Sequence, residues 1–446
     1  MLPGRPRTIA SVLGVLTIGL VIGGCRNAPS TTTPETPARD TGSGRTSLDA
    51  TLEASAPERS RVMSEGFESM NLPAAVMGWV TRDGRTGFES FGKIDPDDPR
   101  PVGPDSLFDI ASMTKAITTV AALQMVERGL VGLDEPLEPL MPELKDIEIL
   151  EEDGTRRPAV RPLTLRDLLR HTSGFAYSFT SPQIVAELEF DPETGWPIDE
   201  IMEEGEYDWG FGIRPRRVFE SGEGWIYGRG VGMAGKLVER LSGQDLDTYL
   251  RANVFDPLGM DRSGFNPEST LLADRVRMHV RDPSSGAPIP AAPFRADRLE
   301  SFYGGGYLYS TPRDYTTFLG CLLGGGVRNG VRILEQSLVD EMMIDQLPEG
   351  IRVLGVPASA IDPNRRSFMN QDGDGFGFGG AIETDGSDGL RPDGVSYWSG
   401  AHNTYYTIDP ERGIAIVFFS QMQPFDDVDS YPLYRLWEDE IYRALP

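Results

Sequence analysis

The sequence predicts an α/β protein in which both ends of the folded body build one sheet, with helices on its faces and a mostly helical lobe inserted between. Apolar runs of strand length lie near both ends of the body, and helical patterns with Pro-rich loops fill the middle. The chain has 446 residues, 39% hydrophobic and 25% charged, which is enough to bury a sizeable core. These values exclude a collagen, a coiled coil and a wholly disordered chain.

The N-terminus predicts an export signal and a lipid anchor. Two arginines precede an apolar run over 9–22, which is too short to span a bilayer but typical of the hydrophobic region of a signal peptide, here 1–24. Two glycines then precede Cys25, a pattern that resembles the lipobox of bacterial lipoproteins. The resemblance implies cleavage before Cys25 and lipidation of its thiol. An ordinary signal peptide followed by an incidental cysteine is the alternative.

Residues 25–56 are rich in Thr, Pro, Ser, Gly and Ala, and such a segment buries too little apolar area to become ordered. We expect a disordered, lipid-anchored tether there and a folded domain over 57–446. The protein is therefore predicted to be exported and held in the cell envelope, on the periplasmic or extracellular face of a membrane. The lipid would be its one contact with that membrane.

The body alternates short strands and helices, without an internal repeat. The turn pair Asp83-Gly84 between two apolar runs predicts a hairpin, and a Thr311 cap before Pro312 predicts a helix start. The inserted lobe is expected at about 131–300. Helices are predicted over 113–128 (amphipathic), 165–171, 232–241, 245–253, 311–323, 335–343 and 431–444, and strands over 74–80, 86–91, 306–310, 376–384, 395–398, 405–408 and 414–420.

Charge and composition exclude several classes of function. The net charge is −26 and no basic stripe is present, which argues against a nucleic-acid partner. The chain has two cysteines and three histidines, far apart and without ligand spacing, so we expect neither a disulfide framework nor a metal site. No phosphate-binding glycine loop occurs, and no cofactor is predicted. Cys321 lies in an apolar run and is expected to be buried.

Ser112 and Lys115 carry the sharpest chemical signal. They are three residues apart at the start of a predicted helix, so their side chains share one face and can touch. Burial lowers the pKa of a lysine until its amine accepts a serine proton, which makes such a pair a nucleophile and a base. Ser90 and Lys93 have the same spacing, but they lie at a strand end with a glycine between them. We interpret that copy as chance and Lys93 as a solvated charge.

Five motifs resemble the serine β-lactamase-related family, which includes class C β-lactamases, D-alanyl-D-alanine carboxypeptidases and family VIII esterases. The motifs are SLFDIASMTK (106–115), LVGLDEP (130–136), LTLRDLLRHTSG (163–174), FDPLGM (255–260) and YGGGYLYSTPRD (303–314). They run in order, and the resemblance covers about 70 to 420. It implies the β-lactamase-like fold of an antiparallel sheet flanked by helices, and an acyl-enzyme formed on Ser112.

The resemblance also implies that Tyr227 is catalytic, as a phenolate-like side chain that takes the Ser112 proton and passes it to the leaving group. On the bare sequence, a half-buried aromatic beside Trp225 is the alternative. The family places an Asn two residues after this Tyr, and here Arg229 replaces it. The replacement puts recognition of a substrate amide in doubt. Arg229 would bind a substrate carboxylate instead, or be a surface charge.

Trp398-Ser399-Gly400 stands where the family has Lys-Thr-Gly or His-Thr-Gly, and it resembles the Trp-Gly-Gly variant of the esterases. The motif lacks the cation with which β-lactamases grip a substrate carboxylate. Trp398 would form the wall of an apolar substrate pocket, Ser399 would keep a hydroxyl there, and Gly400 would admit the substrate backbone. The backbone N–H groups of Ser112 and Ala401 would form the oxyanion hole.

Two histidines near these motifs have other interpretations. His171 lies in a motif that forms a helix end and a turn in the family, so we expect a structural role rather than membership of a triad. His402 follows the oxyanion segment directly, and a substrate contact and a satisfied polar residue on a strand are equally good interpretations.

The sequence therefore predicts a lipid-anchored serine hydrolase, and the missing Lys and Asn favour a carboxylesterase. The alternatives are a β-lactamase, a D-alanyl-D-alanine carboxypeptidase or D-aminopeptidase, and a non-catalytic sensor that binds peptidoglycan or β-lactams. An envelope scaffold is a weaker alternative. The expected partner is a small ester, β-lactam or peptide, while the natural substrate and the oligomeric state do not follow from the sequence. The loops 176–224 and 344–375 are candidates to cap the cleft.

Overall fold

The structure is a computed structural model that describes residues 48–145, 147–187, 189–190, 197–198, 216–293, 295, 298–354, 373–384 and 390–445. The predicted signal peptide, Cys25 and most of the predicted tether lie outside the described residues. So does much of the two candidate capping loops. In the part of the chain that the structure describes, no helix combines the length and the apolar character needed to cross a membrane.

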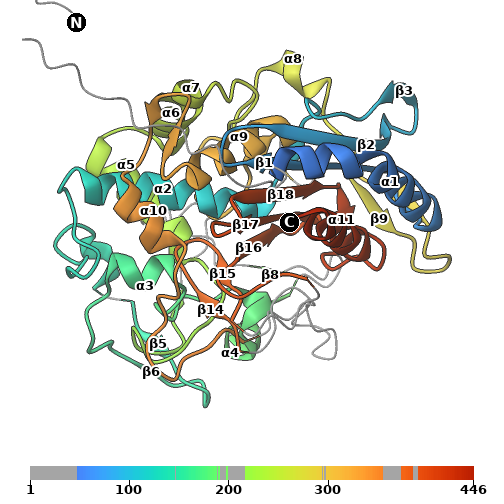
Figure 1. Cartoon of the computed structure of the whole chain (residues 1–446). Coiled ribbons are helices and arrows are strands. Elements are labelled where there is room, and N and C mark those ends of the chain that lie inside the picture. Colours follow the sequence, from blue (N-terminus) through green and yellow to red (C-terminus); the bar gives the residue numbers. More distant parts are fainter. Residues whose placement is uncertain are drawn as a thin grey trace, which may run out of the picture. The chain divides into compact units, whose positions relative to one another are not determined.

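An antiparallel sheet of eight strands joins the two ends of the body. Its order is β14-β15-β16-β17-β18-β1-β2-β3, so N-terminal strands lie beside C-terminal ones (Figure 1). β1 pairs with β18, with Val76 opposite Phe419. These strands are β1 (Ala74–Thr81), β2 (Thr86–Asp95), β3 (Asp98–Pro101), β14 (Gly375–Phe376), β15 (Ala381–Ile382), β16 (Ser396–Gly400), β17 (Thr404–Asp409) and β18 (Ile414–Phe419). The predicted fold class, with one sheet built from both ends, is confirmed.

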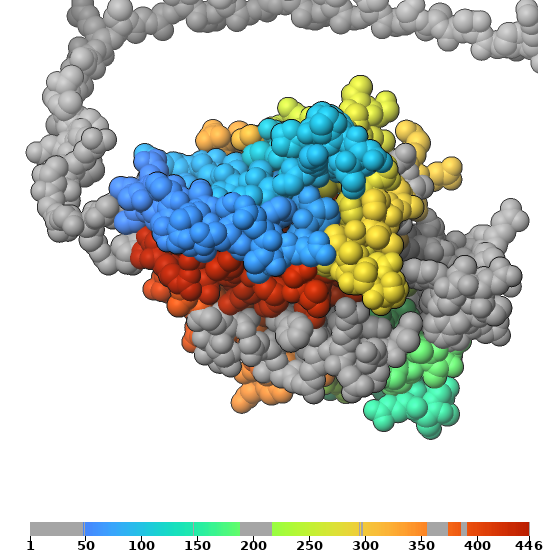
Figure 2. All heavy atoms as spheres, turned by 90° about the vertical axis from the view of Figure 1, so that its right-hand side faces the viewer, coloured from blue at the N-terminus to red at the C-terminus, as the bar shows by residue number. Residues whose placement is uncertain are grey.

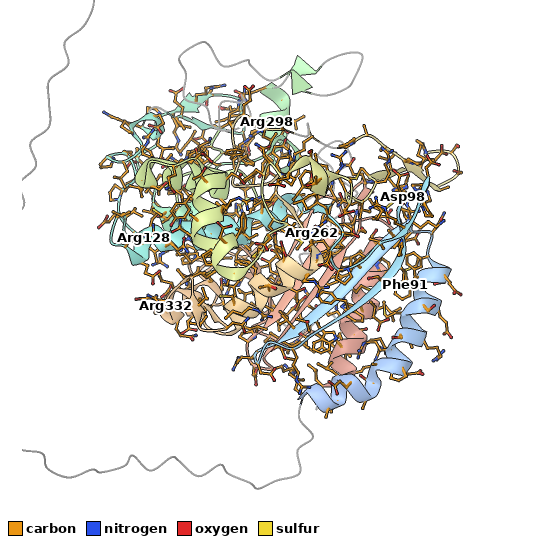
Figure 3. The ribbon with its side chains drawn as sticks, turned by 90° about the horizontal axis from the view of Figure 1, so that it is seen from above. Phe91, Asp98, Arg128, Arg262, Arg298 and Arg332 are labelled. Carbon is orange, nitrogen blue, oxygen red and sulfur yellow. The ribbon has the colours of Figure 1, made fainter. Side chains whose placement is uncertain are left out.

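Helices cover both faces of this sheet. α1 (Leu48–Ser69) and α11 (Ser430–Ala444) pack together on one side, and α9 (Pro312–Leu323) packs against β1 and β18 on the other (Figure 3). In Figure 2 the N-terminal segments in blue lie directly against the C-terminal segments in red. α2 (Thr114–Glu127) and α5 (Gly230–Ser242) pack on each other.

Short elements make up most of the connecting chain. The remaining α-helices are α3 (Leu165–Leu169), α4 (Pro182–Glu187), α6 (Leu246–Leu250), α7 (Asp256–Leu258), α8 (Ser269–Leu272) and α10 (Gln336–Met342), with 3₁₀ turns at Ala111–Met113, Pro142–Leu144 and Ser178–Thr180 and a π turn at Arg251–Phe255. The small sheets pair β4 (Phe108–Asp109) with β11 (Tyr309–Ser310), β5 (Ile149–Leu150) with β6 (Arg156–Arg157), β7 (Glu189–Phe190) with β8 (Pro197–Ile198), β12 (Val327–Arg328) with β13 (Val331–Arg332), and β9 (His279–Arg281) with β10 (Pro288–Pro290) and β19 (Met422–Gln423).

Several boundaries differ from the prediction. α1 begins at Leu48, inside the segment 25–56 predicted as a tether, because Leu52 packs into the core while Pro57 is tolerated within the helix. The segment 376–384 is two short strands, β14 and β15, since Gly379 adopts a φ of 87° and reverses the chain. In the segment 306–310, the strand is confined to its last two residues.

The helix predicted over 113–128 is α2, but it is not amphipathic. Residues from Thr114 to Met125 are buried around its whole circumference, because α5, α6 and the 304–308 segment pack against it. The helix start at Thr311 is confirmed, since the Thr311 side chain accepts a hydrogen bond from the Asp314 N–H. Cys321 is buried, as predicted, and burial raises the pKa of its thiol to about 12.

The position of Leu52 makes the new start of the body testable. Its side chain has 0% exposure, so Leu52→Ala should lower the free energy of unfolding by about 3 kcal/mol through the cavity it leaves. Glu53→Ala is the matched control, because Glu53 is exposed and pairs only with the exposed Arg85, and it should change that free energy by less than about 0.5 kcal/mol. Urea unfolding of the whole chain measures both values, and equal small effects would contradict the packing of α1.

Candidate active site

Ser112 lies on a strained turn between β4 and α2. Ala111, directly before it, has a φ of 44°, a left-handed conformation that a residue with a Cβ adopts only when its surroundings impose it. The Ala111 N–H donates to Asp109 Oδ1 over 2.9 Å, and Thr114 Oγ1 donates to the Ala111 carbonyl over 2.6 Å. These side chains hold the turn in place, and they keep Ser112 partly exposed at the start of the helix.

Lys115 lies beside Ser112, as the spacing predicted. Its Nζ lies 3.2 Å from Ser112 Oγ and donates to the Gly305 carbonyl over 2.7 Å. The side chain has 1% exposure, and the described residues offer it no carboxylate partner. Burial, and secondly the positive charge of Arg229, holds the pKa of Lys115 well below its usual range. A neutral amine can accept the Ser112 proton on its lone pair while it donates to Gly305.

Tyr227 lies beside this pair, as the resemblance implied. Lys115 Nζ is 4.8 Å from the centre of the Tyr227 ring, and Tyr227 has 6% exposure. Burial raises the pKa of Tyr227 far above its usual value, although hydrogen bonds with Ser112 and Trp398 oppose the shift. These causes favour a protonated phenol over the predicted phenolate-like state, and the proton-transfer role of Tyr227 stays a prediction.

The edge of β16 closes the other side of the site. A Cβ on Gly400 would lie 2.3 Å from the Ile110 carbonyl, so only glycine allows the strand to approach the Ser112 turn this closely. Asn403 N donates to the Gly400 carbonyl over 3.0 Å, and this tight turn exposes Ala401. The structure therefore brings the backbone of Ala401 close to the nucleophile turn, while its role in an oxyanion hole stays a prediction.

The predicted substrate-binding side chains have different surroundings. Trp398 packs on Tyr227 at 5.1 Å and on Phe376 at 5.2 Å between ring centres, so it braces the phenol as well as lining the site. Arg229 lies over the ring of Tyr177 at 5.6 Å. Ser399 leaves its strand on the opposite face from Trp398. The substrate contacts of all three stay predictions.

The structure also shows the surroundings of the residues that were predicted to have no catalytic role. Ser90 and Lys93 are exposed on β2, and Gly92 between them has a φ of 87°, so no helical turn brings their side chains together, which agrees with a chance motif. His171, at φ 61° after α3, accepts a hydrogen bond from Gly228 N and packs edgewise on Tyr227 at 5.0 Å, as expected of a structural residue. No group of three potential metal ligands occurs among the described residues.

The sequence analysis did not identify the residues that pack around the Lys115 amine. The Gly305 carbonyl accepts its hydrogen bond, and the hydroxyls of Tyr177 and Tyr303 bond to each other over 2.9 Å beside it. Gly232 makes room for Tyr303, because a Cβ there would lie 2.1 Å from that ring. The motif YGGGYLYSTPRD contained the signal, since three glycines after an aromatic residue indicate a close backbone approach.

Comparisons with known proteins show what the chain is similar to. The family model described as Beta-lactamase matches residues 61–438. The chain is 33% identical over 377 residues to the monacolin J acid methylbutanoyltransferase of Aspergillus terreus, covering 77% of this chain and 83% of that protein. It is 31% identical over 361 residues to the lovastatin esterase of Penicillium rubens, covering 76% and 86%. The unliganded simvastatin synthase of Aspergillus terreus matches with a TM-score of 0.72 at 29% identity, covering 87% of this chain and 98% of that one.

The lowered pKa of Lys115 predicts how the reactivity of Ser112 depends on pH. Lys115 activates Ser112 only when neutral, so labelling by a fluorophosphonate should rise with pH to a plateau, with a midpoint far below the value of about 10.4 for an exposed lysine. Arg229→Gln removes a cation that disfavours the charged amine, so the midpoint should move to higher pH. Arg128→Gln, at the other end of α2, is the control. A midpoint that Arg229→Gln leaves in place would contradict the electrostatic account.

Proposed function

The chain belongs to the β-lactamase family, and on that premise we propose that it is a serine carboxylesterase that carries the acyl group on Ser112. One observation supports this most strongly: a buried amine without a carboxylate partner lies 3.2 Å from a serine on a strained helix start. A structural lysine has no need of that environment, because leaving a buried cation without a counter-charge is costly. A base that must be neutral at working pH requires it.

Acylation would begin when Ser112 Oγ attacks the ester carbonyl carbon. Its proton moves to the lone pair of Lys115 Nζ, and the N–H groups of Ser112 and Ala401 stabilise the tetrahedral oxyanion. The carbon–oxygen bond to the alcohol then breaks. The neutral Tyr227 phenol donates its proton to the departing alkoxide and regains one from the Lys115 ammonium. Water repeats the sequence on the acyl-enzyme, which releases the carboxylic acid and restores Ser112.

The walls of the site favour an ester with an apolar acyl or alcohol part. Trp398 stands at the motif where β-lactam-processing relatives have a cation, so a substrate carboxylate has no partner there. Tyr177, Tyr227 and Trp398 instead offer aromatic surface. Relatives with the same fold include a lovastatin esterase and a methylbutanoyltransferase, whose names denote cleavage and transfer of an acyl group. Transfer to an alcohol in place of water is therefore the second candidate.

We further propose that the protein acts while anchored in the cell envelope. The support is the order of features in 1–56, in which a basic start, a short apolar run and Cys25 precede a segment rich in small and polar residues. A lipid on Cys25 would hold the hydrolase near a membrane surface, within reach of substrates that enter the envelope.

Hydrolysis of p-nitrophenyl butyrate tests the proposed activity. The protein should release p-nitrophenol, and Ser112→Ala should reduce kcat/KM by at least about 1,000-fold because the nucleophile is lost. Ser90→Ala changes the other Ser-x-x-Lys motif and should leave kcat/KM unaltered. A chromogenic cephalosporin run in parallel should be cleaved far more slowly than the ester. Equal ester cleavage by Ser112→Ala would exclude acylation of Ser112, and fast cephalosporin cleavage would indicate a β-lactamase.

Adding an alcohol separates the two candidate reactions. With a primary alcohol in the assay, a transferase should produce the new ester as nitrophenol release continues, whereas a hydrolase should produce free butyric acid. Gas chromatography of the two products measures the ratio, and Ser112→Ala should abolish both.

Metabolic labelling tests the anchor. In a bacterial host that processes lipoproteins, the wild-type protein should incorporate an alkyne-labelled fatty acid and sediment with membranes. Cys25→Ala should lose the label, and Cys321→Ala should keep it, because Cys321 is buried in α9. A label that survives Cys25→Ala would contradict lipidation at this position.

A further inference from the structure

One carboxylate oxygen joins the two backbone segments that carry the proposed oxyanion donors. Asp109 Oδ1 accepts the Ala111 N–H at 2.9 Å and lies 3.6 Å from His402 Nε2. Ala111 is the residue directly before Ser112, and His402 is the residue directly after Ala401. Each segment therefore has a residue adjacent to its donor beside the same atom, one through a hydrogen bond and the other at ion-pair distance.

Both ring nitrogens of His402 face polar side chains. Its Nδ1 lies 3.4 Å from the side-chain nitrogen of Gln423, and its Nε2 lies 3.6 Å from Asp109 Oδ1, which is an ion-pair distance. His402 has 0% exposure, so no solvent molecule competes for this nitrogen at the surface.

Asp109 is held as an anion although it is buried. Burial by itself would raise the pKa of its carboxyl, but His402, the Ala111 N–H and Arg295 outweigh burial and lower it. Its backbone is also fixed, since the Gln421 side chain donates to the Asp109 carbonyl over 2.9 Å and accepts from the Asp109 N–H over 3.2 Å. The carboxylate is therefore a rigid, charged support rather than a side chain that can turn away.

The two segments touch at a second point, which makes their separation sensitive to this support. Thr404 Oγ1 lies 3.4 Å from the Ile110 carbonyl, and Gly400 faces the same carbonyl without room for a Cβ. The close approach of Gly400 to Ile110 limits how near the segments can come, and the Thr404 hydrogen bond and the Asp109–His402 pair hold them together.

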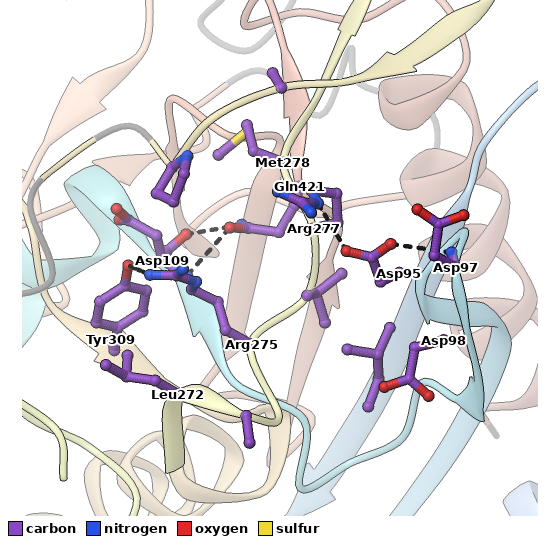
Figure 4. Close-up of a pocket in the computed structure, with 15 residues that line it drawn as sticks. Asp95, Asp97, Asp98, Asp109, Leu272, Arg275, Arg277, Met278, Tyr309 and Gln421 are labelled. Atoms are coloured by element: carbon purple, nitrogen blue, oxygen red, sulfur yellow. Dashed lines mark hydrogen bonds and ion pairs between the residues drawn. The ribbon is translucent and has the colours of Figure 1, made fainter. Parts of the chain in front are cut away.

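Asp109 also lines a pocket of about 350 Å³ behind the Ser112 turn. Figure 4 shows Asp109 at one end of it, beside Tyr309 and Gln421, and Asp95, Asp97 and Asp98 at the other. Asp95 is engaged by Arg277 at 2.7 Å. Asp95 lies on β2, at the end of the pocket away from Asp109, and its ion pair is with Arg277, which makes it a control (Figure 4).

We propose that Asp109 and His402 are positioning residues that set the distance between the Ser112 and Ala401 N–H donors of the oxyanion hole. The proposal rests on the proposed acyl transfer at Ser112. It assigns His402 neither a substrate contact nor a role in proton transfer. The oxyanion donors stabilise charge that develops only in the transition state, so loosening the pair should lower kcat more than it weakens substrate binding. A displacement of about 1 Å in such a site costs about 100-fold in rate.

Kinetics of the full chain with p-nitrophenyl butyrate test the pair. Asp109→Asn keeps the acceptor for Ala111 but loses the charge that holds His402, and His402→Phe keeps the ring shape but loses the donor. Each should lower kcat about 10- to 100-fold and change KM less than about three-fold. His402→Gln, which can still donate, should recover part of kcat. The double variant should be no worse than the poorer single one, because the residues act as a unit.

Binding of phenylboronic acid reports on the oxyanion hole without turnover, since its tetrahedral adduct on Ser112 places an oxygen there. Its affinity should fall with kcat/KM in both variants, while Asp95→Asn should match the wild type in every measurement. An unchanged kcat, a lowered kcat with unchanged boronate affinity, or a loss only of melting temperature would overturn the proposal. Boronate binding without ester hydrolysis by the wild type would contradict the esterase function, and the boronate affinities would still test the pair.

Discussion

The desolvation of the Lys115 amine is the constraint on which the site depends. A lysine with 1% exposure and no carboxylate among the described residues cannot carry its charge cheaply, so the neutral form is favoured. Burial also disfavours the charged forms of two neighbouring side chains. His171 has a pKa held well below its usual value, by burial and then by Lys115, and Tyr227 has a raised pKa. The neutral form of all three groups is therefore favoured, and the proposed acyl transfer would start from a neutral amine at Lys115 and a neutral phenol at Tyr227.

The fold provides this dry environment by joining distant segments. Lys115 comes from α2, its acceptor Gly305 from the segment before β11, and Trp398 from β16 of the sheet. β16 keeps its place because β17 and β18 connect it to β1, so the pairing of the two chain ends fixes one wall of the site. Strain at Ala111 persists because these walls are rigid. The strand pairing that stabilises the sheet therefore also holds the backbone around Ser112 in its geometry.

The features of the fold and the site that depend on neighbouring residues could be predicted from the sequence. Ser112 and Lys115 lie on one helix turn, and the hairpin of β1 and β2 is set by Asp83-Gly84, so spacing was sufficient. The protonation state of Tyr227 depends on burial by side chains from several elements, and the Lys115 acceptor lies 190 residues away. The start of α1 was missed for a related reason. Its composition is that of a linker, and only the packing of Leu52 into the core makes it part of the body.

The two copies of the Ser-x-x-Lys motif show why the spacing has meaning only with its secondary structure. In α2 a separation of three residues brings Ser112 and Lys115 within 3.2 Å and buries the amine. In β2 the same separation lies in a strand, with Gly92 at a φ of 87° between the two residues, and both side chains stay exposed. Solvent keeps an exposed lysine charged, so even adjacent side chains on β2 would lack a base. A nucleophile and base therefore require the helix to set the distance and the core to remove the water, and in the described residues the Ser112 copy has both.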